Sequence, residues 1–410
     1  MPVNACTFDV LLACLFPIAL VVAARRGSWK NLNLRDFFTL KLRKTSHEPF
    51  SLNAAYQSYS NYRRIAILEV SGRRTTYNNL GRGHKRLGNT IGYPEKLDKL
   101  KLVTDMNAVI TERIAELAAD EFGLGEPGAG SEDIGRVRES LKHFIRDWST
   151  YGATEREKMF QPILNILKAV DEGERSGKRV LVPGSGLGRL AWEISQLGAF
   201  LGYHTTANEL SFFMNLAFRF LLSPETTTTT NEHTLRPYAH WFSHQRSNES
   251  LFRAIHFPDA IPRLSPTFHL VEADFLTLKA PSAVPPTFIW SKSDPARHEA
   301  GYDYIITLFF IDTSANVLAT MEHVYTLLRP GGTWINLGPL LWASGYAKIE
   351  LSLDEVVRAA EEIGFVVHDG DPATGDLFAR RTVECEYTAD ANAMMRWIYK
   401  AEFWVATKPK

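Results

Sequence analysis

The stretch that decides the fold is RVLVPGSGLGRLAWEIS, residues 179–195. It begins with a short apolar strand, Arg179–Pro183, passes through a glycine-rich turn, Gly184–Gly188, and continues into a helix-like segment, Arg189–Leu197. Glycines let the backbone turn sharply and approach a ligand closely, and the free N–H groups at the start of the helix face that ligand. In an open parallel sheet this turn lies in the crevice beyond the carboxyl ends of the strands. The stretch therefore predicts a ligand site at one edge of an α/β sheet.

The same rhythm of strand and helix continues to the end of the chain. Strand-like runs occupy residues 200–206, 268–273, 302–311, 333–337, 365–368 and 403–407. Helix-like runs lie between them, at residues 210–222, 314–328 and 353–363. Such alternation favours a mostly parallel sheet with helices on both of its faces.

The part that precedes this domain has a different pattern. Apolar residues recur at helical spacing from about residue 48 to residue 122, and a second helical stripe follows over residues 134–148. We therefore divide the chain into an apolar segment and linker (1–47), a helical region (48–160) and an α/β domain (161–410). The first part contains the apolar run Val10–Ala24, whose 15 residues are fewer than the ~20 that a spanning helix needs. We favour a non-spanning tail or a mistaken start site for this run, and membrane association stays open.

Composition and charge exclude several classes of protein. The chain has 410 residues, of which 45% are apolar and 22% charged, as in an ordinary globular protein. Its 46 Lys and Arg balance 46 Asp and Glu, so no overall basic excess is available to hold a nucleic acid. Three cysteines are too few for a disulfide framework and favour a reducing compartment. We expect a cytoplasmic protein without a nucleic-acid partner; the nucleus as a second location, and a homodimer, stay open.

The ligand at the glycine turn is better explained as S-adenosylmethionine than as a dinucleotide. An NAD fingerprint would place Gly or Ala where this chain has Arg189. Glu209, after the second strand, can hold ribose hydroxyls, with a helix N-terminal carboxylate as the alternative reading. Asp274 and Phe275, after the third strand, can meet an adenine base, although a turn Asp and a core Phe would also suit that place. With the Pro-Gly-Gly segment at 330–332, these pieces resemble a class I S-adenosylmethionine-dependent methyltransferase, whose sheet carries an antiparallel edge strand.

A closer resemblance rests on several blocks that occur in order. They are VLVPGSGLGRLAWEISQLG, NELSFFMNLA, HTLRPYAHWFSHQRS, FFIDTSANV, LRPGGTWINLGPLLW and IELSLDEV. Together they resemble the carnosine N-methyltransferase family from about residue 50 to residue 408. The resemblance implies transfer of a methyl group from S-adenosylmethionine to an imidazole nitrogen of a β-alanyl-histidine dipeptide, which gives anserine.

The resemblance also implies roles for individual residues. The cofactor would be bound by His143, Arg146, Gly184, Gly186, Glu209, Asp274, Phe275 and Leu308, and the substrate by Asp312, Trp397 and Tyr399. Of these, Asp312 and Tyr399 are the expected catalytic residues. Two positions depart from the family: His143 stands where Gln is common, and Ala343 stands where the family has a substrate-side His.

An imidazole acceptor suits this set of residues. With a pKa of ~6.5, an imidazole is mostly neutral at pH 7, so it needs an orienting partner more than a strong base. If Asp312 accepts a hydrogen bond from one ring nitrogen, the other nitrogen keeps its lone pair for the methyl group. The carboxylate would also stabilise the positive charge that the ring gains in the transition state. The alternative role for Asp312 is an N-cap of the helix that begins near Ser314.

Other functions stay open from the sequence. The acceptor could be a protein histidine or a metabolite amine, or the chain could be a non-catalytic scaffold that binds S-adenosylmethionine. His240 and His244 stand four residues apart, but no third ligand has matching spacing, so we expect no metal site.

Overall fold

The computed structural model describes residues 49–128, 132–198, 202–283, 300–342 and 346–410. The N-terminal segment 1–47, with its apolar run Val10–Ala24, lies outside the described residues, and so does Ala343. None of the described helices combines the length and the apolar character needed to cross a membrane.

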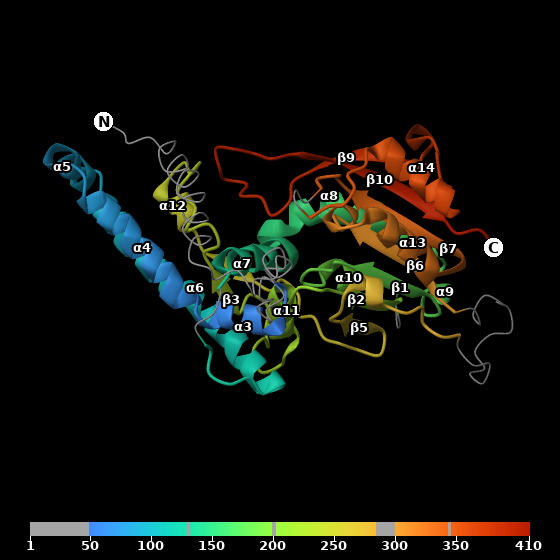
Figure 1. The fold of residues 1–410 in the computed structure, drawn as a ribbon, viewed down its shortest axis with the longest axis horizontal. Helices are drawn as coiled ribbons and strands as arrows, with labels where there is room; N and C mark the ends of the chain where they lie inside the picture. The colour runs from blue at the N-terminus through green and yellow to red at the C-terminus, as the bar shows by residue number, and fades with distance from the viewer. Residues whose placement is uncertain (1–48, 129–131, 199–201, 284–299, 343–345) are drawn as a thin grey trace, which may run out of the picture. The chain divides into compact units, whose positions relative to one another are not determined.

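The first half of the described chain is helical, as its periodicity predicts. Its elements are α3 (Leu52–Ser60), α4 (Tyr62–Asn78), α5 (Arg82–Thr90), α6 (Tyr93–Phe122), α7 (Ile134–Trp148), η2 (Thr150–Gly152), α8 (Ala153–Lys168) and α9 (Glu172–Arg175). The long helix α6 lies between two glycines in left-handed conformation, Gly92 and Gly123, and Pro94 occupies its first turn. Helices α4 and α6 lie side by side, and α5 joins their ends far from the sheet (Figure 1).

The second half forms one eight-stranded sheet with the order β5-β2-β1-β6-β7-β10-β8, and β9 pairs beside β8 on the outer side of β10. The strands are β1 (Arg179–Pro183), β2 (His204–Asn208), β5 (Phe268–Val271), β6 (Tyr302–Leu308), β7 (Leu328–Gly338), β8 (Val366–Val367), β9 (Arg381–Cys385) and β10 (Tyr399–Thr407). Pairs among β5, β2, β1, β6 and β7 are parallel, whereas β10 pairs antiparallel with its neighbours. This is the mostly parallel α/β sheet with an antiparallel end that the sequence predicts.

Helices cover both faces of the sheet, because alternate strand residues point to opposite sides. Val180 and Val182 of β1 belong to the apolar cluster that also contains residues of α7, α8 and α11 (Phe212–Leu222), while Leu181 packs with α13 (Val317–Leu327) and α14 (Leu353–Ile363). Helix α10 (Arg189–Ser195) follows the glycine turn. The remaining short elements are α12 (Asn248–Leu251), η3 (Phe275–Thr277), η5 (Ile311–Thr313) and η6 (Pro372–Thr374).

Several short elements of the described chain were not predicted, among them the strand β9 and a separate β-hairpin. Strands β3 (His233–Leu235) and β4 (Ile255–Phe257) pair as a separate antiparallel hairpin inside the long connection between β2 and β5. Each strand has only three residues, which is too short for a readable alternation of apolar and polar side chains.

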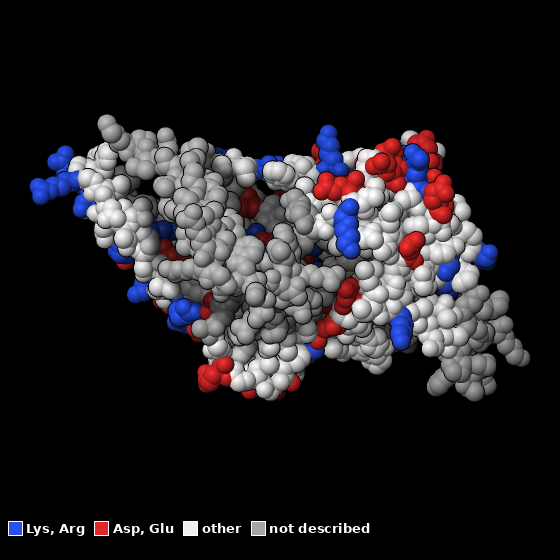
Figure 2. Space-filling model, viewed as in Figure 1, with Lys and Arg blue, Asp and Glu red and all other residues white. Residues whose placement is uncertain are grey.

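Charged side chains are unevenly distributed, although the total charge is zero. Basic residues gather at the α5 end, where Arg82, Lys85 and Arg86 occur without an acidic neighbour on the helix, and acidic residues gather over α14 (Figure 2).

Candidate functional site

The glycine turn between β1 and α10 has the conformation that glycine permits and other residues resist. Gly184, Gly186 and Gly188 all have positive φ angles, of 62°, 56° and 71°. A Cβ atom on Gly188 would lie 2.4 Å from the ring of Phe218, and one on Gly184 would lie 2.5 Å from the ring of Phe310. At Gly186 the nearest atom would be 3.8 Å away, on the ring of His143. The middle of the turn is therefore the part with room for a small side chain.

Glu209 lies directly against this turn. One of its carboxylate oxygens accepts a hydrogen bond from the Gly186 N–H at 2.9 Å, and the other accepts one from the Ser211 N–H at 2.8 Å. Burial raises the pKa of Glu209, and the two backbone N–H groups oppose that rise. The sequence-predicted ribose-binding acid and the glycine turn are therefore in contact in the structure.

His143 and Arg146 both lie on α7, and the His143 ring reaches the turn at Gly186. Both side chains are buried, and Asp147 contacts both, with oxygens 3.3 Å from His143 Nδ1 and 3.0 Å from Arg146 Nε. Burial opposes the charge on Arg146, but Asp147, Tyr387 and Glu155 together outweigh burial and raise the pKa of the guanidinium. Arg146 Nη1 is buried and has no hydrogen-bond partner among the described residues. Arg146 is therefore a buried cation with an unused N–H donor, which is what binding an anionic group of a ligand requires.

Asp274 and Phe275 occupy the corner after β5. Asp274 is exposed and caps the short helix η3, where its carboxylate accepts from the Leu276 N–H at 3.0 Å. The ring of Phe275 is buried and meets the ring of Phe310 edge-on at 5.4 Å. Because Phe310 also packs against Gly184, the corner and the glycine turn share one wall.

Asp312 and Tyr399 form a second group, beyond the carboxyl end of β6. Asp312 is buried, and its Oδ2 atom accepts a hydrogen bond from the Leu341 N–H at 3.0 Å. Burial raises the pKa of Asp312 to about 6, and the Leu341 N–H opposes that rise. After burial, the charge of Asp312 is the next largest cause that raises the pKa of the Tyr399 hydroxyl, which places the two groups within electrostatic range of each other.

The alternative reading of Asp312 as a helix cap is wrong. The N-cap of α13 is Asn316, whose side chain accepts from the Ala319 N–H.

The two other residues predicted near Asp312 lie at its inner and outer ends. Leu308 ends β6 and is buried, so it connects the Asp312 group to the sheet. Trp397 is 64% exposed, with its ring 6.4 Å from that of Tyr399, so it stands at the outer rim of this group.

Two residues of the site were missed by sequence reasoning. Phe309 has a left-handed backbone, with φ of 51°, which is unusual for a bulky side chain and marks a constrained position beside Asp312. Tyr387, in the segment after β9, stacks on the ring of Phe309 at 4.7 Å. Neither the φ angle of Phe309 nor the contact of Tyr387 leaves a signal in the sequence.

Arg189, which breaks the dinucleotide pattern, has a structural partner. Its guanidinium forms an ion pair with Asp259, which also binds Arg156 at 2.7 Å, and all three side chains are nearly buried. Arg189 therefore ties the start of α10 to the segment after β4 instead of making room for a pyrophosphate.

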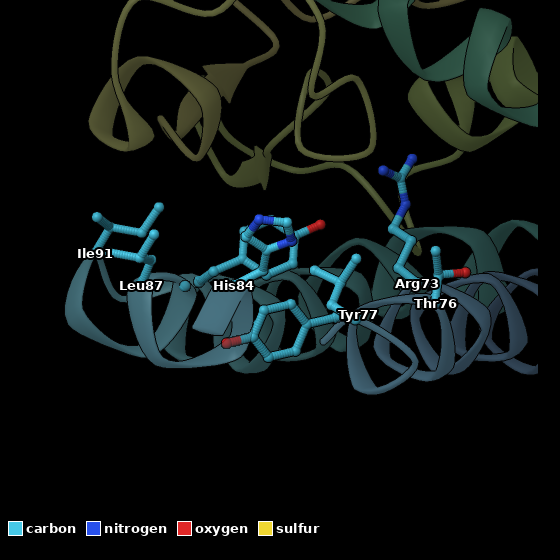
Figure 3. Close-up of a pocket in the computed structure, with 9 residues that line it drawn as sticks. Arg73, Thr76, Tyr77, His84, Leu87 and Ile91 are labelled. Carbon is cyan, nitrogen blue, oxygen red and sulfur yellow. The ribbon is translucent and has the colours of Figure 1, made fainter. Parts of the chain in front are cut away.

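Two cavities of the described part of the chain show where a ligand could bind. A cavity of about 230 Å³ lies between α7, α8 and the segment after β9, and Arg146 lines it. A larger one, of about 540 Å³, lies at the α5 end, lined by Tyr77, His84, Leu87 and Ile91, and is remote from the glycine turn (Figure 3). No group of three or more His, Cys, Asp or Glu side chains that could hold a metal ion occurs in the part of the chain that is described.

The residues around the glycine turn fit S-adenosylmethionine. Arg146 offers a free donor for a carboxylate, Glu209 stands where ribose hydroxyls would be held, and the buried hydroxyl of Ser185 in the turn has no partner among the described residues. The sheet order and this arrangement are those of a class I S-adenosylmethionine-dependent methyltransferase.

Comparison with known proteins narrows the class of methyltransferase. A family model described as carnosine N-methyltransferase matches residues 127–410. The carnosine N-methyltransferase of Mus musculus is 32% identical over 337 residues, which cover 78% of this chain and 76% of the mouse protein. That of Schizosaccharomyces pombe is 30% identical over 377 residues, which cover 85% of this chain and 93% of the yeast protein. A solved magnesium protoporphyrin IX methyltransferase from Synechocystis PCC 6803 with bound SAH is 12% identical, with a TM-score of 0.36 over 67% of this chain and 95% of that chain.

This chain belongs to the carnosine N-methyltransferase family. It is an S-adenosylmethionine-dependent N-methyltransferase.

Proposed function

We propose that the enzyme methylates an imidazole nitrogen of the histidine in carnosine or a related histidine dipeptide, and that anserine is the product from carnosine. The observation that carries the proposal is the buried carboxylate of Asp312 beside Tyr399, at the carboxyl edge of the sheet next to the glycine turn. The names of the family relatives support the same acceptor.

On the cofactor side, we assign tasks to five of the predicted residues. Arg146 would bind the carboxylate of S-adenosylmethionine, Glu209 the ribose hydroxyls, and Asp274 the adenine amino group, with Phe275 against the base. Leu308 would line the pocket at the end of β6. When bound, S-adenosylmethionine supplies a methyl group on a positively charged sulfur.

On the acceptor side, Asp312 has the central task. The Leu341 N–H fixes the direction of its carboxylate, and a carboxylate has further lone pairs that can accept an imidazole N–H. That hydrogen bond would select the tautomer in which the second ring nitrogen carries the lone pair. As the ring gains positive charge during the reaction, the nearby carboxylate stabilises it, and burial strengthens this interaction because the local dielectric is low.

Tyr399 and Trp397 would form the wall on the other side of the acceptor. Tyr399 is half-buried and meets Phe309 edge-on at 5.4 Å, so its ring is held in place. Trp397 is mostly exposed and can close over a bound dipeptide only from the rim.

The proposal is tested with S-adenosylmethionine that carries a labelled methyl group, offered separately with carnosine, with β-alanine, and with a denatured protein rich in histidine. We expect label in carnosine and none in β-alanine, because β-alanine has the amine but no imidazole. Label only in the protein would show that the acceptor is a protein histidine. Cofactor binding with no transfer to any acceptor would point to a non-catalytic scaffold.

A further inference from the structure

Tyr387 joins the two halves of the site. It lies in the segment between β9 and β10, outside every motif of the family resemblance. The Arg146 guanidinium lies over its ring, with Cζ 4.3 Å from the ring centroid, and the Phe309 ring stacks on it at 4.7 Å with 26° between the planes. His143 meets the same ring edge-on at 5.7 Å.

The contact with Arg146 matters because Tyr387 and the Asp147 carboxylate together hold that side chain. Its Nε and Nη1 atoms are buried without a hydrogen-bond partner among the described residues, although Asp147 lies 3.0 Å from Nε. The ring of Tyr387 lies against the guanidinium and so helps to fix the guanidinium plane. A cation over an aromatic face is stabilised more strongly when the pair is shielded from water.

The contact with Phe309 matters because the backbone there is constrained. Phe309 adopts a φ of 51°, its N–H donates to the Leu337 carbonyl at 2.9 Å, and its ring meets Tyr399 edge-on. A left-handed conformation at a bulky residue persists only where the surroundings hold it. Tyr387 supplies a stacked ring at that position, three residues before Asp312.

We infer that Tyr387 is a positioning residue that sets the Arg146 guanidinium toward the cofactor and the Phe309–Tyr399 pair toward the acceptor. The acceptor half of this inference rests on the proposed function, whereas the cofactor half does not. Tyr387 itself acts through its neighbours and takes no part in the transfer.

Two substitutions separate the ring from the hydroxyl. Tyr387→Phe keeps the stacked ring, and we expect its dissociation constant for S-adenosylmethionine to stay within about threefold of wild type. Tyr387→Leu removes the aromatic face, and we expect about tenfold weaker cofactor binding in calorimetry, as the loss of a shielded cation–π contact implies. With carnosine as acceptor, Tyr387→Leu should raise the acceptor KM by a larger factor than it lowers kcat.

Tyr325 provides a matched control on the other side of the sheet. It is half-buried, Lys408 lies over its ring at 4.6 Å, and Phe365 meets it edge-on at 5.0 Å. Tyr325→Leu should leave the dissociation constant for S-adenosylmethionine unchanged. Equal loss of affinity in Tyr325→Leu and Tyr387→Leu, or wild-type affinity in Tyr387→Leu, would overturn the inference.

The calorimetric test needs no acceptor, so it is independent of the proposed function. If Tyr387→Leu weakens cofactor binding while the wild-type enzyme transfers nothing to carnosine, the cofactor half stands and the proposed acceptor is wrong. If kcat and KM for carnosine are unchanged in a Tyr387→Leu enzyme saturated with cofactor, the acceptor half is wrong.

Discussion

Asp312 is the residue on which the acceptor chemistry depends. Asp312→Asn keeps the size of the side chain and an oxygen that can accept from the Leu341 N–H, but it removes the negative charge. We expect at least a hundredfold lower kcat, the scale seen when one electrostatic stabiliser of a transition state is removed. The dissociation constant for S-adenosylmethionine should change little. Steady-state kinetics with calorimetry on the same preparation checks both, and an unchanged kcat would remove Asp312 from the mechanism.

The pKa of Asp312 gives a second test that needs no substrate. Burial raises it to about 6 in the folded protein, so the folded state binds the proton more tightly than the unfolded chain does. The stability that this proton contributes is present below about pH 4 and is lost as the pH rises to about 6. Asp312→Asn lacks this titration.

Urea unfolding at pH 4 and pH 8 measures the effect. We expect the free energy of unfolding of Asp312→Asn, relative to wild type, to rise by about 2 to 3 kcal/mol between the two pH values. A difference that stays constant with pH would show that the carboxylate is not buried in the folded protein.

At the scale of elements, the turn between β1 and α10 allows two glycines to be compared. Gly186→Ala adds a Cβ that would only touch the His143 ring, so we expect a stable protein, with about 1 kcal/mol of backbone cost, that binds S-adenosylmethionine poorly. Gly188→Ala drives its Cβ into the ring of Phe218, so we expect a lower melting temperature as the main effect. Thermal unfolding and calorimetry of both variants test this; cofactor affinity that survives in Gly186→Ala would mean that the ligand does not approach this turn.

The elements that the sequence predicts well are those with a long or clean period. The helix α7, the strand β1 and the glycine turn follow from apolar spacing and from glycine, and α14 occupies the predicted residues 353–363. The hairpin β3–β4 has three residues in each strand, so its alternation is too short to recognise. Asp312 shows why helix caps are hard to predict from sequence. Asp and Asn are both good N-caps, and only the backbone decides that Asn316 caps α13.

At the scale of the whole molecule, a buried ion network connects distant segments. Asp259, after β4, pairs with Arg156 of α8 and with Arg189 of α10. Asp259→Asn would remove the carboxylate that two nearly buried guanidinium groups share, leaving Arg189 with Glu193 alone, and we expect a loss of about 3 kcal/mol in the free energy of unfolding. Denaturant unfolding measures it, with cofactor affinity of the folded protein preserved; a loss below about 1 kcal/mol would mean that the network is solvated.

The site as a whole was only partly predictable from sequence. The carboxyl ends of parallel strands meet at one edge, so Gly184, Glu209 and Asp274 follow from the α/β pattern, whereas Asp312 was implied by the family resemblance. Tyr387 reaches the same place through the antiparallel pair β9–β10, whose register with the rest of the sheet no local pattern specifies. Because its position depends on long-range strand pairing, Tyr387, which we infer to link the two halves of the site, could not be predicted from sequence.

The most direct measurement of the central claim is where the methyl group lands. Carnosine is incubated with the enzyme and S-adenosylmethionine, and the product is fragmented in a mass spectrometer, with Asp312→Asn as the parallel reaction. The account predicts one added methyl group on the imidazole fragment in the wild-type reaction, and almost no methylated product with Asp312→Asn. A methyl group on the β-alanyl amine, or an equal yield of methylated imidazole from Asp312→Asn, would contradict it.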